Sequence, residues 1–407
     1  MSERIGLLSG YLRGSEVIVR DLLAQVGIEI GGSGPLEIRV HDDRFYDRVL
    51  SQGAFGLAES YVDGWWNCDR LDQVICRMLE EDLISRVPRD WRTATAWLRA
   101  QLLNLQTVAR ASQVAHAHYD LGNDFFAAML GRTMTYSCGY WTPGTSGTSG
   151  TPGALGPAAT SLDEAQDRKF ELICKKLDLG PSDHVLDIGC GWGGFARWAA
   201  ERVGARVTGV TVSEPQAAFA RAHCRGLPVD IQVLDYRSPE MIRRGPFTKV
   251  VSVGMFEHVG NKNYRTFMQI ARDAMGPSNL GGMMLLQTIG RSGWCESSDA
   301  WVDRYLFPNA MLPTMSEISE AAAHMYVIED WHNFGGDYDK TLMAWHANFE
   351  RAIVERNPCI PASDRFRRMW RYYLLAFAGS FRSRVRMQLW QVVLSPRGVR
   401  SGYRSIR

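Results

Sequence analysis

Residues 184–203 read HVLDIGCGWGGFARWAAERV and place three predicted elements in a fixed order. The apolar run HVLDI predicts a buried strand, and the glycine-rich segment after it predicts a tight turn. GFARWAAERV then has the length and apolar spacing of a helix. A glycine-rich turn between a strand and a helix is where a nucleotide-binding loop belongs in an α/β protein.

The alternation of strands and helices continues downstream of this turn. Helical spacing is found in 214–226, and the last predicted strand is MQLWQVVLS, residues 387–395. Strands are also predicted in ARVTGVTV (205–212), VDIQVLD (229–235), FTKVVSVG (247–254) and GGMMLLQTIG (281–290). This order predicts a mostly parallel, doubly wound α/β sheet, whose ligands bind at the carboxyl ends of the strands.

The chain has 407 residues, which is room for more than one domain. Residues 1–90 combine helical patterning with a short strand and predict a smaller N-terminal α+β domain. A helical linker follows over 91–142, and a loop rich in Gly, Pro, Ser and Thr is expected over 143–160. The α/β domain is expected over 161–407.

The net charge of +2 conceals a strong asymmetry, because residues 365–407 contain eleven arginines and no Asp or Glu. Such a basic segment favours an anionic membrane surface or a nucleic acid. The arginines are interleaved with Trp370, Tyr372 and Tyr373, which suit a membrane interface. A helix with a solvated arginine face is the simpler alternative. Because the chain carries no RNA-binding signature, a nucleic-acid partner is not expected.

The cysteine pattern and the hydropathy of the chain indicate where in the cell the protein is expected. The eight cysteines contain no C-x-x-C pair, so no metal site is expected. The first residues are too polar for a cleavable signal sequence, and no stretch approaches the roughly 18 apolar residues of a transmembrane helix. These features predict a cytoplasmic protein whose membrane contact is at most peripheral.

The glycine-rich turn fits two cofactors. Gly189, Gly191 and Gly194 match G-x-G-x-x-G, the dinucleotide pattern, whereas D-x-G-x-G-x-G matches Asp187, Gly189, Gly191 and Gly193, as in S-adenosylmethionine (SAM) methyltransferases. A carboxylate facing a pyrophosphate would be repelled, but Asp187 can bind the ammonium group of SAM. This difference favours SAM.

Residues at the ends of the next two strands support SAM. Asp235 can accept a hydrogen bond from the adenine amino group, and Tyr236 can stack on the ring. The second strand ends without an immediate acidic residue for the ribose hydroxyls. Thr211 and Gln216 are therefore expected to bind the ribose, with Glu214 as a less favoured substitute.

The motifs HYDLGNDFF, YSCGYW, VLDIGCGWGGFA, VTGVTVSEPQ, VVSVGMFEHVG, FPNAMLP, EDWHNFGGDYDKTLMAW and FRSRVRMQLWQVV occur in this order. Together they resemble those of the cyclopropane-fatty-acyl-phospholipid synthases, over nearly the whole chain. The resemblance implies a class I SAM-methyltransferase fold and transfer of a methylene unit from SAM to the cis double bond of an unsaturated phospholipid acyl chain. It also implies a homodimer and an N-terminal domain that holds lipid or tethers a second subunit.

The resemblance further implies that a bound bicarbonate is the base that removes a proton from the transferred methyl group. Its cage would be formed by Cys138, Glu257, the backbone of Ile289, and Tyr338. The chain departs from the family at Gln287, where a histidine is usual. An amide can donate a hydrogen bond to an anion but cannot carry a proton.

The resemblance also implies that Tyr136, Ser137 and Cys190 contact the cofactor.

Three other functions remain open from the sequence. A lipid C-methyltransferase would share the first step and give a methyl-branched or methylene product, and Gln287 makes this alternative worth testing. A non-catalytic SAM- or lipid-binding paralogue and an NAD-dependent oxidoreductase are the others. If the strand before Glu257 continues, His258 points to the opposite face and is expected to have a structural part.

Overall fold

The computed structural model describes residues 14–32, 34, 36–83, 121–141, 157–276, 281–292 and 299–407. Most of the predicted linker over 91–142, and most of the loop predicted over 143–160, lie outside these residues. The two segments therefore stay predictions.

A seven-stranded sheet forms the centre of the larger part of the molecule, in the order β5-β4-β3-β6-β7-β9-β8. The first five strands in this order are parallel, and β9 pairs antiparallel with both β7 and β8. The strands are β3 (His184–Ile188), β4 (Arg206–Thr211), β5 (Val229–Val233), β6 (Lys249–Val253), β7 (Met283–Arg291), β8 (Val327–Asn333) and β9 (Met387–Ser395). The predicted doubly wound sheet is confirmed. Strand β8 was not predicted, because it begins with exposed residues and lacks an apolar run.

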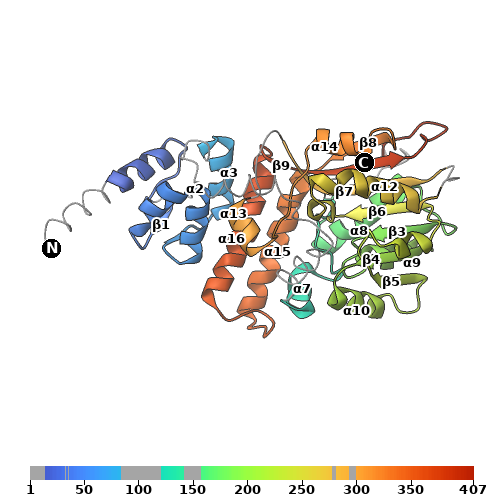
Figure 1. The fold of residues 1–407 in the computed structure, drawn as a ribbon. Coiled ribbons are helices and arrows are strands. Elements are labelled where there is room, and N and C mark those ends of the chain that lie inside the picture. Colours follow the sequence, from blue (N-terminus) through green and yellow to red (C-terminus); the bar gives the residue numbers. More distant parts are fainter. Residues whose placement is uncertain are drawn as a thin grey trace.

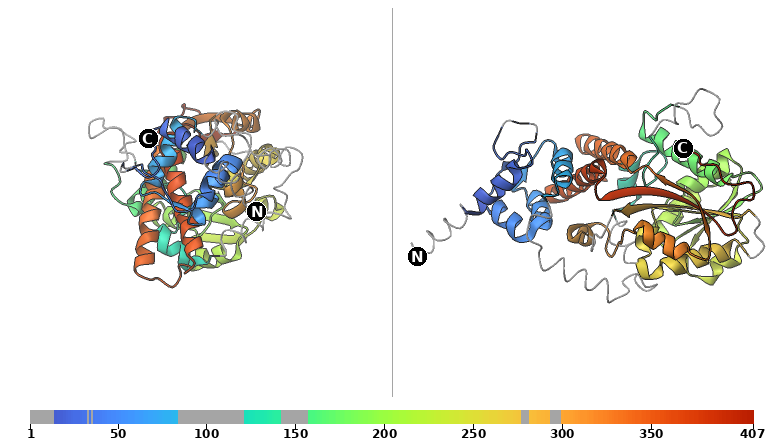
Figure 2. Two further views of the ribbon diagram at one scale, coloured as in Figure 1. Left: turned by 90° about the vertical axis from the view of Figure 1, so that its left-hand side faces the viewer. Right: turned by 90° about the horizontal axis from the view of Figure 1, so that it is seen from above.

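Helices cover both faces of this sheet, which is why its strands read as nearly continuous apolar runs. On one face, Leu186 and Leu286 pack with α11, α12 and α14. On the other face, Val185 and Leu285 pack with α8 and α9. Figure 2 shows the two helical layers from above. The helices flanking the sheet are α8 (Leu162–Leu177), α9 (Gly194–Arg202), α10 (Glu214–His223), α11 (Pro239–Arg243), α12 (Tyr264–Ala274) and α14 (Met315–Ala322).

A smaller α+β unit precedes the sheet, and α15 and α16 stand between the two (Figure 1). Helix α3 packs against α16 so closely that a Cβ atom at Gly379 would lie 2.3 Å from the carbonyl oxygen of Asp72. Only glycine permits this approach. The elements outside the sheet are β1 (Arg39–Val40), α2 (Arg44–Val62), β2 (Trp66–Asn67), α3 (Leu71–Glu80), α7 (Asn123–Leu130), α13 (Ala300–Tyr305), α15 (Gly336–Val354) and α16 (Asp364–Ser383).

The aromatic residues of the basic segment lie in the core, which corrects the interpretation drawn from the sequence. Trp370, Tyr372 and Tyr373 on α16 are buried, and Trp370 packs edge-on against Phe125 at 4.9 Å between ring centroids. They are therefore not membrane-interface side chains.

Several arginines of the same segment form internal ion pairs instead of a free basic face. Their partners lie at the end of α2, on α3, α15 and β8, and in the turn after α3. The pairs are Arg365 with Asp63, Arg371 with Glu350, Arg382 with Asp72 and Asp339, Arg386 with Asp82, and Arg407 with Asp330. Within the described ranges, no helix is long and apolar enough to cross a membrane.

Candidate active site

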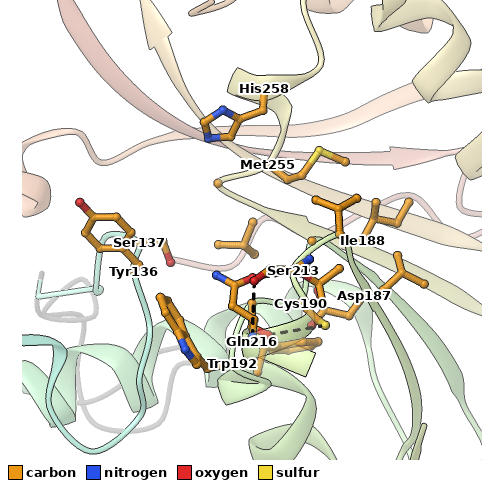
Figure 3. A pocket seen from close by; sticks show the side chains of 18 of the residues that line it. Tyr136, Ser137, Asp187, Ile188, Cys190, Trp192, Ser213, Gln216, Met255 and His258 are labelled. Atoms are coloured by element: carbon orange, nitrogen blue, oxygen red, sulfur yellow. Dashed lines mark hydrogen bonds between the residues drawn. The ribbon is translucent and has the colours of Figure 1, made fainter. Parts of the chain in front are cut away.

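A cavity of about 210 Å³ opens where the parallel strands end. Its walls come from the turn after β3, the ends of β4, β5 and β6, and the segment before α8. Figure 3 shows Tyr136 and Ser137 entering from one side and Asp187 and Cys190 from the other. The residues predicted to bind the cofactor that line it are Tyr136, Ser137, Asp187, Gly189, Cys190, Gly191, Thr211, Gln216, Asp235 and Tyr236.

Asp187 supplies a carboxylate at the end of β3. Its side chain is buried and lines the cavity, and it has no hydrogen-bond partner among the described residues. Burial raises the pKa of Asp187 to about 7, against the opposing influence of the positive charge on Lys169. A cationic ligand would stabilise the ionised form, so this carboxylate fits the ammonium group of SAM.

The two residues predicted to bind the ribose, Thr211 and Gln216, both line the cavity. Thr211 donates a hydrogen bond to Gln216 across 3.0 Å from Oγ1 to Oε1, which leaves the Gln216 amide N–H groups to donate. Glu214 is exposed and pairs with Arg221. Glu214 does not line the cavity. In the sequence analysis it was only the less favoured substitute for binding the ribose.

Asp235 and Tyr236, the two residues predicted to contact the adenine, differ in their surroundings. Both carboxylate oxygens of Asp235 accept hydrogen bonds from the guanidinium of Arg237, each at 2.7 Å. The contact of Asp235 with the adenine amino group stays a prediction. Tyr236 lines the cavity, and its buried hydroxyl has no hydrogen-bond partner in the described part of the chain.

Gly193 does not line the cavity, unlike the other predicted glycines. It precedes α9 with a φ of +82°, and a Cβ atom there would lie 3.0 Å from Cβ of Ala220. Its place in the motif is explained by the close packing of α9 on α10. Gly194 lines the cavity instead.

Lys169, Trp192, Met255 and His258 line the cavity but were not predicted to. The orientation considered for His258 required the strand to continue, but β6 ends at Val253 and residues 256–258 form a short 3₁₀ turn, from which His258 lines the cavity (Figure 3). Its structural part stays a prediction. Burial lowers the pKa of His258 to about 4, so the ring is neutral. Lys169 gave no signal in the sequence, since a lysine on an amphipathic helix is normally solvent-exposed.

Glu257 lies in the same turn but outside the cavity lining. Its Oε1 accepts a hydrogen bond from the backbone N–H of Ile289 at 2.7 Å, while its buried Oε2 has no partner among the described residues. Burial raises the pKa of Glu257 to about 7. The N–H of Ile289, which was expected to face the anion, thus holds the carboxylate of Glu257.

Gln287 lies on β7, two residues before Ile289, so the two side chains are on the same face of the strand. Its Oε1 accepts a hydrogen bond from Nε2 of Gln391 on β9 at 2.9 Å. The buried Nε2 of Gln287 and Oε1 of Gln391 have no partners within the described ranges. Like Oε2 of Glu257, these two buried polar atoms have unused hydrogen-bonding capacity.

Cys138 and Tyr338 come from other parts of the chain. The Cys138 thiol is fully buried, donates to the carbonyl of Gly139 at 3.1 Å, and accepts a hydrogen bond from the Thr341 hydroxyl of α15 at 3.7 Å. Tyr338, also on α15, stacks on Phe381 at 4.4 Å between centroids. Burial raises the pKa of the Cys138 thiol, which favours its neutral, hydrogen-bonding form.

A substitution at Gly189 tests whether the turn after β3 shapes the cavity. Gly189 has a φ of +85°, and an added Cβ would lie 2.7 Å from Cβ of Met255, a cavity residue. We expect Gly189→Ala to weaken binding of S-adenosylhomocysteine (SAH) about tenfold by isothermal titration calorimetry. Gly204→Ala is the matched control, because Gly204 has a φ of +77° but its nearest neighbour would be 3.6 Å away. Equal losses in both variants would contradict this role for Gly189.

The family model described as mycolic acid cyclopropane synthetase matches residues 106–392. The chain is 44% identical over 390 residues to the cyclopropane-fatty-acyl-phospholipid synthase of Escherichia coli strain K12, covering 96% of this chain and 95% of that protein. It is 36% identical over 375 residues to a probable fatty acid methyltransferase of Pseudomonas putida, covering 87% of this chain and 85% of that protein.

Among solved structures, the chain resembles the mycolic acid cyclopropane synthase CmaA1 complexed with SAH and CTAB. The identity is 26% and the TM-score 0.57, over 70% of this chain and 98% of CmaA1. The cavity at the strand ends is where a cofactor belongs in this fold. The chain therefore belongs to the mycolic acid cyclopropane synthetase family and is a SAM-dependent methyltransferase.

Proposed function

We propose that the protein transfers a methylene unit from SAM to the cis double bond of an unsaturated acyl chain within a phospholipid, forming a cyclopropane ring. The observation that carries the proposal is a set of three buried polar atoms without hydrogen-bond partners among the described residues: Oε2 of Glu257, Nε2 of Gln287 and Oε1 of Gln391. Ring closure needs a proton acceptor in a site from which water is excluded. The similarity to the Escherichia coli enzyme supports the lipid substrate.

Bicarbonate is the proposed base, and the unused polar atoms fit it. Nε2 of Gln287 would donate to the anion, and Oε2 of Glu257 would accept its hydroxyl proton. Bound there, bicarbonate would supply the basic oxygen that takes up the proton. Cys138 and Tyr338 are proposed as further members of the cage, and Ile289 as the residue that orients Glu257.

Aromatic residues beside the cofactor cavity suit the positive charge that develops on the acyl chain. Tyr136 lies 5.2 Å from Trp345 and 6.3 Å from Phe307 between ring centroids. Their π faces can stabilise a carbocation-like centre. Tyr136 is held in place by a 2.7 Å hydrogen bond between its hydroxyl and that of Tyr373.

Incubation with vesicles of unsaturated phospholipid and SAM carrying a trideuterated methyl group tests the product. We expect the modified acyl chain to retain two of the three deuterium atoms in a ring, as seen by mass spectrometry and gas chromatography. Retention of all three deuterium atoms would contradict ring formation. Heat-denatured protein is the control.

Lipid C-methylation is the second candidate function. The Pseudomonas putida relative is named a probable fatty acid methyltransferase. The family resemblance also implies that Gln287 replaces a histidine of the cyclopropane synthases. A methyl-branched or methylene product in the vesicle assay would favour this function over cyclopropanation.

We further propose a cytoplasmic enzyme that associates peripherally with membranes and forms a homodimer, with the N-terminal unit holding lipid or the second subunit. The size of the lipid substrate and the family resemblance support this proposal. Co-sedimentation with vesicles and light scattering test the two parts separately. A monomer that remains in the supernatant would contradict both.

A further inference from the structure

We propose that Lys169 binds the carboxylate of the amino-acid end of SAM, opposite Asp187, so that the two side chains recognise this end of the cofactor as a zwitterion. Both side chains line the same cavity and come from different elements, α8 and β3. The inference depends on SAM as co-substrate and not on which lipid product is formed.

Hydrogen bonds hold the Lys169 ammonium at the cavity wall. Nζ donates to Oγ of Ser137 at 2.8 Å and to Oε1 of Gln166 at 2.6 Å. Gln166 in turn donates to the carbonyl of Ser137 at 2.8 Å. The ammonium is therefore fixed beside Ser137, which Figure 3 shows on the other side of the cavity from Asp187 and Cys190.

One hydrogen-bonding position of Lys169 remains unused. An ammonium group has three donors, and two of them have acceptors in the described part of the chain. The side chain is fully buried, where an uncompensated charge is costly. Lys169 and Asp187 form no direct ion pair among the described residues, although their charges influence each other.

A zwitterionic ligand would pair with both Lys169 and Asp187. Its carboxylate would accept a hydrogen bond from the unused donor of the Lys169 ammonium, and its ammonium would bind the Asp187 carboxylate. Charged hydrogen bonds in a buried site are stronger than neutral ones, so this contact should contribute strongly to affinity. Ser137 would present its hydroxyl to the same carboxylate.

The test compares two ligands, SAH and its analogue in which hydrogen replaces the carboxylate group, by isothermal titration calorimetry. The wild-type protein should bind SAH about tenfold to a hundredfold more tightly than the analogue. In Lys169→Met, the two ligands should bind with nearly equal affinity. If Lys169 only held the segment of Ser137 in place, the substitution would weaken both ligands equally and preserve the ratio.

Lys176→Met is the matched control. Lys176 is also a buried lysine on α8, but it pairs with Asp330 and does not line the cavity. It should keep the wild-type ratio. A wild-type protein that binds both ligands equally, or a Lys169→Met variant that keeps the ratio, would overturn the proposal. The first outcome needs no variant to fold, and binding of SAH itself is independent of the lipid product.

Discussion

Replacement of Glu257 by glutamine is expected to lower kcat about 10²–10⁴-fold in the vesicle assay, with little change in SAH affinity. Glutamine can still accept the hydrogen bond from Ile289 N–H, which Glu257 accepts at 2.7 Å. It cannot provide the negatively charged oxygen that the unpartnered Oε2 supplies. Because Glu257 lies outside the cofactor cavity, SAH affinity serves as the control. Unchanged kcat would contradict a catalytic part for Glu257.

The same substitution should alter the pH dependence of activity and stability. Burial raises the pKa of Glu257 from 4.5 to about 7, so wild-type activity should fall as the pH drops through about 7. In folding, a raised carboxyl pKa means that stability is greatest below 4.5 and is lost as the pH rises through about 7. Glu257→Gln should therefore be more stable than wild type at pH 8, by up to about 3 kcal/mol.

Urea denaturation at pH 8 and pH 4 measures this difference in the free energy of unfolding. The two proteins should differ at pH 8 and converge at pH 4. A variant that is both less active and less stable at pH 8 would show that Glu257 supports the fold instead of the chemistry.

Replacement of Arg382 by methionine should lower the free energy of unfolding by about 2–4 kcal/mol. Arg382 joins α16 to α3 and α15, since its guanidinium pairs with Asp72 at 2.5 Å and with Asp339 at 2.8 Å. Asp72 is only 3% exposed, so its charge would lose its closest partner in a buried site. The expected loss is below the full value for a buried pair because Arg382 is partly exposed and Arg70 lies 3.6 Å from Asp72.

Arg386→Met is the matched control for this prediction. Arg386 pairs with Asp82 at 2.9 Å, but both side chains are substantially exposed. Its loss should cost less than about 1 kcal/mol. Similar costs for both arginines in urea denaturation would contradict a special part for Arg382 in joining α16 to α3 and α15.

Local patterns were sufficient to predict much of this fold. Apolar runs alternate with helical spacing, and both faces of each central strand are apolar, as a covered parallel sheet requires. The order of strands across the sheet and the antiparallel place of β9 depend on long-range pairing, which no local pattern specifies. Strand β8 was missed because its first residues are exposed and carry no alternation.

The cofactor site was predictable for a related reason. Its ligands follow directly after strands, and parallel strands bring their carboxyl ends to one edge. Lys169 and His258 could not be found in this way, because one comes from the middle of a helix and the other from a turn whose direction is set by packing.

The sequence by itself determined the parallel strands, the glycine turn and the carboxylate at the end of β3, because each depends on neighbouring residues. Only the tertiary structure decided which charged side chains form ion pairs and which are buried. Arginines that read as a basic surface are bound to acidic residues hundreds of positions away, as in Arg382 with Asp72. Lys169, which reads as a surface lysine, is buried at the cofactor cavity. Burial and charge pairing are properties of residues distant in sequence, so they exist only once the chain has folded.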